Sequence, residues 1–200
     1  MSDYTKQYHS ALESANDLPD EELDNYEAPD GSLLFQHDIL SGMDERFRQA
    51  EVVYTEPAWR KGFQRFMKRA EVDRPEDYSD YIGRQEAVIR ELGVPAFMIG
   101  GRNTFPYVDP DDGHEIWFDF HDCEAWVYLW NGAEDGFDPY EIESVVDVLY
   151  HVVENYDWAL DFNCGQGRTA RAMNDAGKHA ICSDVNGRCI RQIAEDVYGV

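Results

Sequence analysis

The sequence predicts a mixed, mostly parallel α/β sheet. Three observations support this fold class: short apolar runs alternate with helical patterns along the chain, a glycine-rich turn joins a strand to a helix near the C-terminus, and two aromatic runs flank a short polar turn. Strands that alternate with helices are typical of parallel sheets covered on both faces, and an aromatic hairpin adds antiparallel strands at one edge.

The expected elements follow from hydrophobic periodicity. Residues 139–156 have apolar positions spaced three and four apart, which predicts an amphipathic helix, whereas short apolar runs bounded by Gly, Pro or Asp predict strands. Strands are expected at 32–40, 51–59, 94–101, 114–120, 124–130, 158–162 and 179–185. Helices are expected at 60–70, 80–92, 139–156, 167–177 and 187–199, with a short helical or turn connection at 41–50.

The first 30 residues are polar and acidic, and we expect an acidic N-terminal tail or short helices there. A docking or nucleic-acid-mimicking role for this segment stays open. Residues 31–200 form the expected core, because neither a repeat nor a second domain interrupts the pattern.

The composition limits the class of protein. A chain of 200 residues with 43% hydrophobic content suits one globular domain. No apolar run approaches the roughly 20 residues of a membrane span, so we expect a cytoplasmic protein without membrane contact. The four cysteines show no Cys-x-x-Cys spacing and are expected to be reduced thiols. No metal site is expected, because His114, His121 and Cys123 do not follow a recognised ligand spacing.

The charge of the chain is strongly negative. Forty-one acidic residues against 17 basic ones give a net charge of −24. Such a surface repels nucleic-acid phosphates, whose binding draws on clustered Lys and Arg. Two explanations stay open: a native cytoplasm rich in salt, which screens the repulsion, or a basic partner that is not part of this chain.

The glycine-rich turn reads "DFNCGQGRTARAM", residues 161–173. Gly165, Gly167 and Ala170 give Gly-x-Gly-x-x-Ala, a pattern also found in dinucleotide-binding turns. Asp161 ends the preceding strand, where it would repel a pyrophosphate but could accept hydrogen bonds from an ammonium group. Asp184 ends the next strand, where a carboxylate can bind both hydroxyls of a ribose.

S-adenosylmethionine carries an ammonium group and no phosphate, so Asp161 favours it over a nicotinamide cofactor. An ordinary strand-to-helix turn, with Asp161 capping the helix, is the alternative without a ligand.

The segment "LDFNCGQGRTARAM…GKHAICSDVN" resembles the cofactor-binding segment of amino-group DNA methyltransferases, usually Asp-Pro-Phe-Cys-Gly-Ser-Gly-Thr-Thr. Phe162, Asn163, Gln166 and Arg168 stand where the family has proline, an aromatic residue, serine and threonine. The resemblance implies binding of S-adenosylmethionine by Asp161, Asn163, Cys164, Gly165, Gly167, Thr169, Asp184 and Asn186.

A second motif supports this resemblance. Residues 52–59, "VVYTEPAW", are similar to the family's strand ending in Asp/Asn/Ser-Pro-Pro-aromatic, with Ala58 in place of the second proline. Upstream, "LLFQHDILSGM" is similar to the strand that leads into that motif, with Asp38 on its acid. The catalytic motif thus precedes the cofactor turn, as in the circularly permuted β-type members. That order implies a Rossmann-like, seven-stranded sheet in the order 3-2-1-4-5-7-6, with the strand at 158–162 in its interior.

The resemblance also implies a reaction, the transfer of a methyl group to the exocyclic amine of adenine, or as second choice cytosine, in DNA. Glu56 and the carbonyl of Pro57 would accept the amine hydrogens, and Trp59 would stack on a flipped base. Asp38 would lie near the cofactor or the substrate. Because Glu56 lies outside the cofactor turn, Glu56→Gln is expected to leave cofactor affinity unchanged.

Alternatives follow from departures at the catalytic motif. Glu56 is one methylene longer than aspartate and Ala58 removes a proline, so a catalytically altered or inactive S-adenosylmethionine-binding protein or subunit stays open, as does a non-DNA substrate.

The core needs all the residues between Trp59 and Asp161, which leaves no evident target-recognition domain. A protein partner could supply recognition, and weak DNA binding is expected from the chain alone at low salt. An origin in a phage or archaeal virus, and hence a host cytoplasm, and the oligomeric state are left open.

Overall fold

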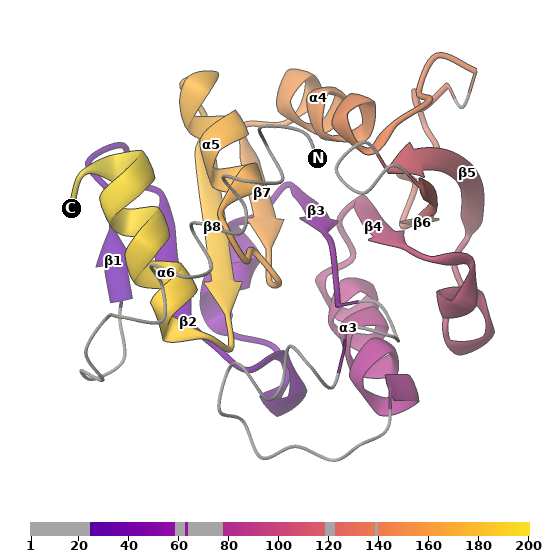
Figure 1. Cartoon of the computed structure of the whole chain (residues 1–200), viewed down its shortest axis with the longest axis horizontal. Coiled ribbons are helices and arrows are strands. Elements are labelled where there is room, and N and C mark those ends of the chain that lie inside the picture. The colour runs from indigo at the N-terminus through magenta and orange to yellow at the C-terminus, as the bar shows by residue number, and fades with distance from the viewer. Residues whose placement is uncertain (1–24, 59–62, 64–77, 119–122, 139) are drawn as a thin grey trace.

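The computed structural model describes residues 25–58, 63, 78–118, 123–138 and 140–200. An eight-stranded sheet forms its centre, in the order β1-β2-β8-β7-β3-β4-β6-β5 (Figure 1). The strands are β1 (Asn25–Glu27), β2 (Leu33–Gln36), β3 (Val52–Thr55), β4 (Ala96–Gly100), β5 (Asp112–Phe118), β6 (Cys123–Trp130), β7 (Trp158–Asp161) and β8 (His179–Asp184). The α-helices are α3 (Tyr78–Leu92), α4 (Val145–Asn155), α5 (Arg168–Asp175) and α6 (Gly187–Ile193).

The sheet confirms the expected fold class. Strands β2, β8, β7, β3 and β4 are parallel, and β6 and β5 pair antiparallel at one edge. Counted from β7 as the first strand, these seven strands run 3-2-1-4-5-7-6, with β7 in the interior as predicted. The molecule therefore has a Rossmann-like methyltransferase fold in permuted chain order.

The expected number of strands is wrong by one. β1 pairs antiparallel with β2 at the sheet edge, inside the segment that we expected to be a tail or short helices. Tyr26 packs against the core while Asn25 and Glu27 are exposed, so three residues suffice to continue the sheet. Residues 1–24 and most of the helix predicted at 60–70 lie outside the described residues.

Helices cover both faces of the sheet (Figure 1). α4, α5 and α6 pack on one face around Val148, Met173 and Ile190. α3 packs on the other face, together with two short 3-10 turns, Ile39–Ser41 and Glu45–Gln49. Two further turns complete the described part: a 3-10 turn at Arg102–Tyr107 and a π-helical turn at Ala194–Tyr198. No helix within the described ranges is long and apolar enough to cross a bilayer.

The direction of winding reverses between β7 and β3. From β7 the chain passes through α5 to β8 on one side, whereas from β3 it passes through α3 to β4 on the other. Ligands of open α/β sheets bind beside the carboxyl ends of the strands at such a reversal. The two motifs singled out in the sequence follow these two strands.

Gly167 fits tightly between the turn and α6. Its φ is +76°, and a Cβ there would lie 2.6 Å from Cγ1 of the buried Ile193. We expect Gly167→Ala to lower the free energy of unfolding by about 1–2 kcal/mol for the left-handed backbone and about 1–3 kcal/mol more for the overlap. Gly177→Ala is the matched control, since its φ is +68° but nothing lies within 4 Å. Urea unfolding measures both variants, and equal losses would mean that Ile193 moves aside at little cost.

Candidate functional site

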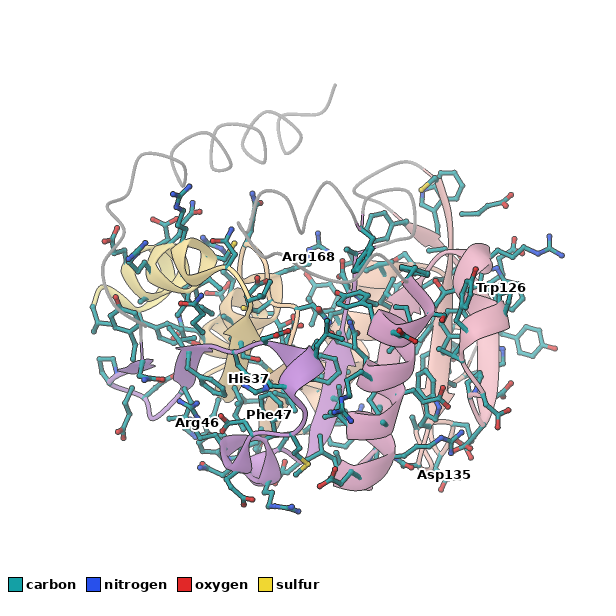
Figure 2. All side chains as sticks on the ribbon, turned by 90° about the horizontal axis from the view of Figure 1, so that it is seen from below. His37, Arg46, Phe47, Trp126, Asp135 and Arg168 are labelled. Atoms are coloured by element: carbon teal, nitrogen blue, oxygen red, sulfur yellow. The ribbon has the colours of Figure 1, made fainter. Side chains whose placement is uncertain are left out.

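The candidate site lies where β7, β3 and β8 end. Figure 2 views the molecule from the side towards which the β7 and β8 arrows point in Figure 1. Arg168, the first residue of α5, is labelled there, and in this view it lies between α6 and α3. Side chains from all three strand ends and from α3 meet around this position, as the contacts below describe.

Asp161 is buried beneath the cofactor turn. Its side chain accepts hydrogen bonds from the Thr169 hydroxyl at 2.7 Å and from the Asn163 backbone N–H at 3.1 Å. Burial above all, together with the nearby Glu56 and Asp184, raises the pKa of Asp161 to about 7 against the lowering effect of these two hydrogen bonds. Both carboxylate oxygens thus organise the turn, and each retains a second lone pair as an acceptor.

Asp184 ties the end of β8 to the same turn. One oxygen accepts the Gly165 N–H at 3.0 Å, and the other accepts the Asn186 N–H at 2.8 Å. Burial raises its pKa, although the side chain is less enclosed than that of Asp161. Asn186 itself caps α6 by accepting the Arg188 N–H. Gly165, Asp184 and Asn186 thus form one hydrogen-bonded corner at the place where a ribose is expected.

The glycines give the turn its shape. Gly165 has a φ of +50°, and a Cβ there would meet nothing nearer than the Asn163 carbonyl oxygen at 3.8 Å, so the turn leaves space on this side. Cys164 is buried below, next to Cys182, and burial raises the pKa of its thiol well above the ordinary value. Because a thiolate is the reactive form, burial and the raised pKa disfavour Cys164 as a nucleophile.

The side-chain amide of Asn163 joins three elements. Its Nδ2 donates to the Thr55 hydroxyl at 2.8 Å and to the Gln85 side-chain oxygen at 3.0 Å, and its Oδ1 accepts from the Tyr81 hydroxyl at 2.8 Å. Tyr81 also accepts a hydrogen bond from the Ala58 backbone N–H. The amide predicted to bind cofactor is therefore used inside the protein, where it connects the turn, the end of β3 and α3.

Glu56 follows β3 and is bound from two sides. Its Oε1 accepts from the Tyr54 hydroxyl at 2.6 Å and pairs with the Arg168 guanidinium. Side chains alternate along a strand, so Tyr54 and Glu56 face α5, whereas Thr55 faces α3. Only 18% of the Glu56 side chain and 23% of the Arg168 side chain are exposed.

Arg168 was missed as a functional candidate because it departs from the motif, standing where the family has threonine. Thr55, Tyr81 and Gln85 were missed as well, although Gln85 interrupts the apolar stripe of α3 with a fully buried amide. A polar residue in a buried stripe indicates a hydrogen-bonded role, and that signal was present in the sequence.

The remaining predicted residues lie at the edges of this arrangement. Pro57 is buried behind Glu56, and Trp59 lies outside the described residues. Asp38 caps a short 3-10 turn by accepting the Leu40 N–H at 3.1 Å. Asp38 follows β2, and β2 pairs with β8, the strand that ends in Asp184. Asp38 therefore lies on the same side of the site as Asp184. Across the described part of the chain, no three His, Cys, Asp or Glu side chains are grouped so that they could hold a metal ion.

Comparison with solved structures finds a similar fold. The crystal structure of M1.HpyAVI aligns with 80% of this chain and 95% of its own, at 11% identity and a TM-score of 0.51. The crystal structure of the M1.HpyAVI-SAM complex aligns over 80% and 96% of the two chains, at 10% identity and a TM-score of 0.46. Models of known protein families and curated protein sequences gave no match. The likeness establishes the fold.

The buried Asp161 predicts a pH-dependent stability. Its folded pKa of about 7 exceeds the ordinary 3.8, so its contribution to the free energy of unfolding is complete below pH about 4 and is lost as the pH rises through about 7. Asparagine does not ionise, so the Asp161→Asn variant does not lose stability in this way as the pH rises. We expect the variant to gain on the order of a few kcal/mol relative to the wild type between pH 4 and 8.

Urea unfolding across that pH range measures the difference. Asp175→Asn, an exposed position on α5, controls for the loss of one negative charge. A difference between Asp161→Asn and the wild type that does not vary with pH would show that Asp161 is not a buried titrating carboxyl.

Proposed function

We propose that this chain is an S-adenosylmethionine-dependent methyltransferase that acts on the exocyclic amine of adenine, with cytosine as second choice, in DNA. One observation carries the proposal. The two loops with the family's motif patterns meet at the reversal between β7 and β3, where Arg168 contacts Glu56 and Asn163 contacts Thr55. A cofactor held by one loop would therefore lie beside the residues of the other.

The residues of the turn fit the cofactor. Gly165 leaves the backbone open to a ligand, and Asp184 has an acceptor lone pair left on each oxygen for ribose hydroxyls. Asp161, when ionised, adds negative charge below an ammonium group and disfavours a pyrophosphate. When bound, S-adenosylmethionine supplies an electrophilic methyl group on a positive sulfur.

Glu56 is suited to accept a hydrogen from the substrate amine. Its Oε1 is occupied by Tyr54 and Arg168, while Oε2 has no hydrogen-bond partner among the described residues. Oε2 and the carbonyl of Pro57 would hold the amine hydrogens and free the nitrogen lone pair for attack. Trp59 would stack on the flipped base.

A second candidate is a methyltransferase-like protein that binds cofactor without methylating DNA, or that methylates another class of substrate. The pairing of Glu56 with Arg168 favours it, because the guanidinium weakens the carboxylate as an acceptor. The net charge of −24 also disfavours a nucleic-acid substrate unless salt or a basic partner offsets the repulsion.

Cofactor binding is tested by calorimetry with S-adenosylmethionine, its demethylated product and NAD. We expect the wild type to bind the first two and Asp184→Ala to bind them at least about tenfold more weakly, because a charge-assisted ribose contact contributes about 1.5–3 kcal/mol. Asp184→Asn separates the ribose contact from the loss of the turn's own bonds. Equal affinity in the wild type and Asp184→Ala, or preferential binding of NAD, would refute the assignment.

The substrate is tested by the transfer of labelled methyl groups to DNA, RNA and protein. We expect label in the adenine of DNA, and more of it at molar salt, where repulsion between the acidic surface and phosphates is screened. Label in RNA or protein alone would support the other substrate classes. Cofactor binding without transfer to any pool would support the non-catalytic candidate.

A further inference from the structure

The ion pair between Arg168 and Glu56 joins the two loops of the site. Arg168 follows Gly167 directly and opens α5, while Glu56 follows the last residue of β3. Tyr54 holds the same Glu56 oxygen from below at 2.6 Å. The Tyr54 hydroxyl and the Arg168 guanidinium thus hold the Glu56 carboxylate against the cofactor turn, although Glu56 lies outside the cofactor motif.

The position of Arg168 is not explained by the stability of α5. The N-terminal end of a helix carries partial positive charge, so a cation in the first turn is unfavourable there, and an acid is preferred. The first turn of α5 contains no acidic residue. The negative charge that offsets this helix end comes instead from Glu56, on a different strand.

We propose that Glu56 is a specificity-determining residue of the cofactor site, which makes the turn favour S-adenosylmethionine over its demethylated product, which lacks the positive charge on sulfur. This inference rests on the proposed function, since it requires that the cofactor binds at this turn. Glu56 is held there by Arg168 and Tyr54, and its charge acts on any ligand that contacts the turn. The expectation that Glu56→Gln leaves cofactor affinity unchanged is therefore revised, because Glu56 contacts the first helical residue after the glycines.

The size of the effect follows from the electrostatics of partly enclosed charges. Two unit charges about 6–8 Å apart at an effective dielectric constant between about 20 and 80 change a binding constant by roughly two- to hundredfold. Glu56→Gln removes one unit of negative charge, and this change is the same whatever else Arg168 contacts. The two ligands share their ammonium and carboxylate groups and differ in the positive charge on sulfur, so the ratio of their affinities isolates the effect of Glu56 on that charge.

The experiment is calorimetry with S-adenosylmethionine and its demethylated product on the full chain. Glu56→Gln should lower the affinity for S-adenosylmethionine about two- to hundredfold relative to that for the product. Arg168→Gln should shift the ratio in the opposite direction. The double variant restores the local net charge, so its ratio should return close to the wild-type value.

Asp196→Asn is the matched control. Asp196 pairs with Arg171, one turn further along α5, at 3.5 Å, and both side chains are about half exposed (49% and 47%). Asp196→Asn also removes one negative charge from an acid that pairs with an arginine of α5, but at a more exposed position. It should leave the ratio of the two ligand affinities unchanged. A shift as large as that of Glu56→Gln would mean that overall charge, and not Glu56, sets the ratio, and would overturn the inference.

The other outcomes separate the two proposals. If the wild type binds both ligands but Glu56→Gln changes them equally or not at all, the inference fails and the proposed function stands. If the wild type binds neither ligand, both fail. If circular dichroism shows that Glu56→Gln does not fold, Arg168→Gln carries the test, and a ratio that does not move towards S-adenosylmethionine overturns the inference.

Discussion

The pairing of β3 with β7 is the constraint on which the rest of the molecule depends. These two strands lie far apart in the sequence, yet Val53 stands opposite Leu160, and the sheet is wound outwards from them in both directions. The amide of Asn163 fixes the junction by bonding Thr55 on one strand end and Tyr81 and Gln85 on α3. The contacts of Glu56 with Arg168 and of Asn163 with Thr55 also cross this junction.

Charge is concentrated at this junction in an unusual way. Glu56 and Asp184 both lie close enough to Asp161 to raise its pKa. Among the described contacts, Arg168 is the cation that pairs with an acid of this group, Glu56. Under the proposed function, this balance of charge would favour a small cationic ligand. On a chain with a net charge of −24, the proposed DNA substrate and the proposed cofactor would therefore place opposite demands on the electrostatics of the site.

Local patterns predicted the fold well and the site in part. Alternating apolar runs identified the seven long strands, and the resemblance supplied their order, because order is a long-range property that periodicity does not encode. β1 was missed since "NYE" has one inward residue and no repeat. The Arg168–Glu56 pair was missed because residues so far apart leave no spacing signal, and the use of Asn163 inside the protein was hidden by its place in a cofactor motif.

The position of β8 in the sheet has a consequence for the order of events during synthesis. β8 lies between β2 and β7, with Leu33 opposite Ile181 and Leu160 opposite the same residue on the other side. The ribosome delivers the β1–β2 hairpin first and the strand that must sit beside it almost a whole domain later. Until then the parallel edge of β2 has no partner, and contacts of such high sequence separation form slowly. A nascent chain of this topology exposes an open strand edge for most of its translation, which is the state that chaperones protect from association.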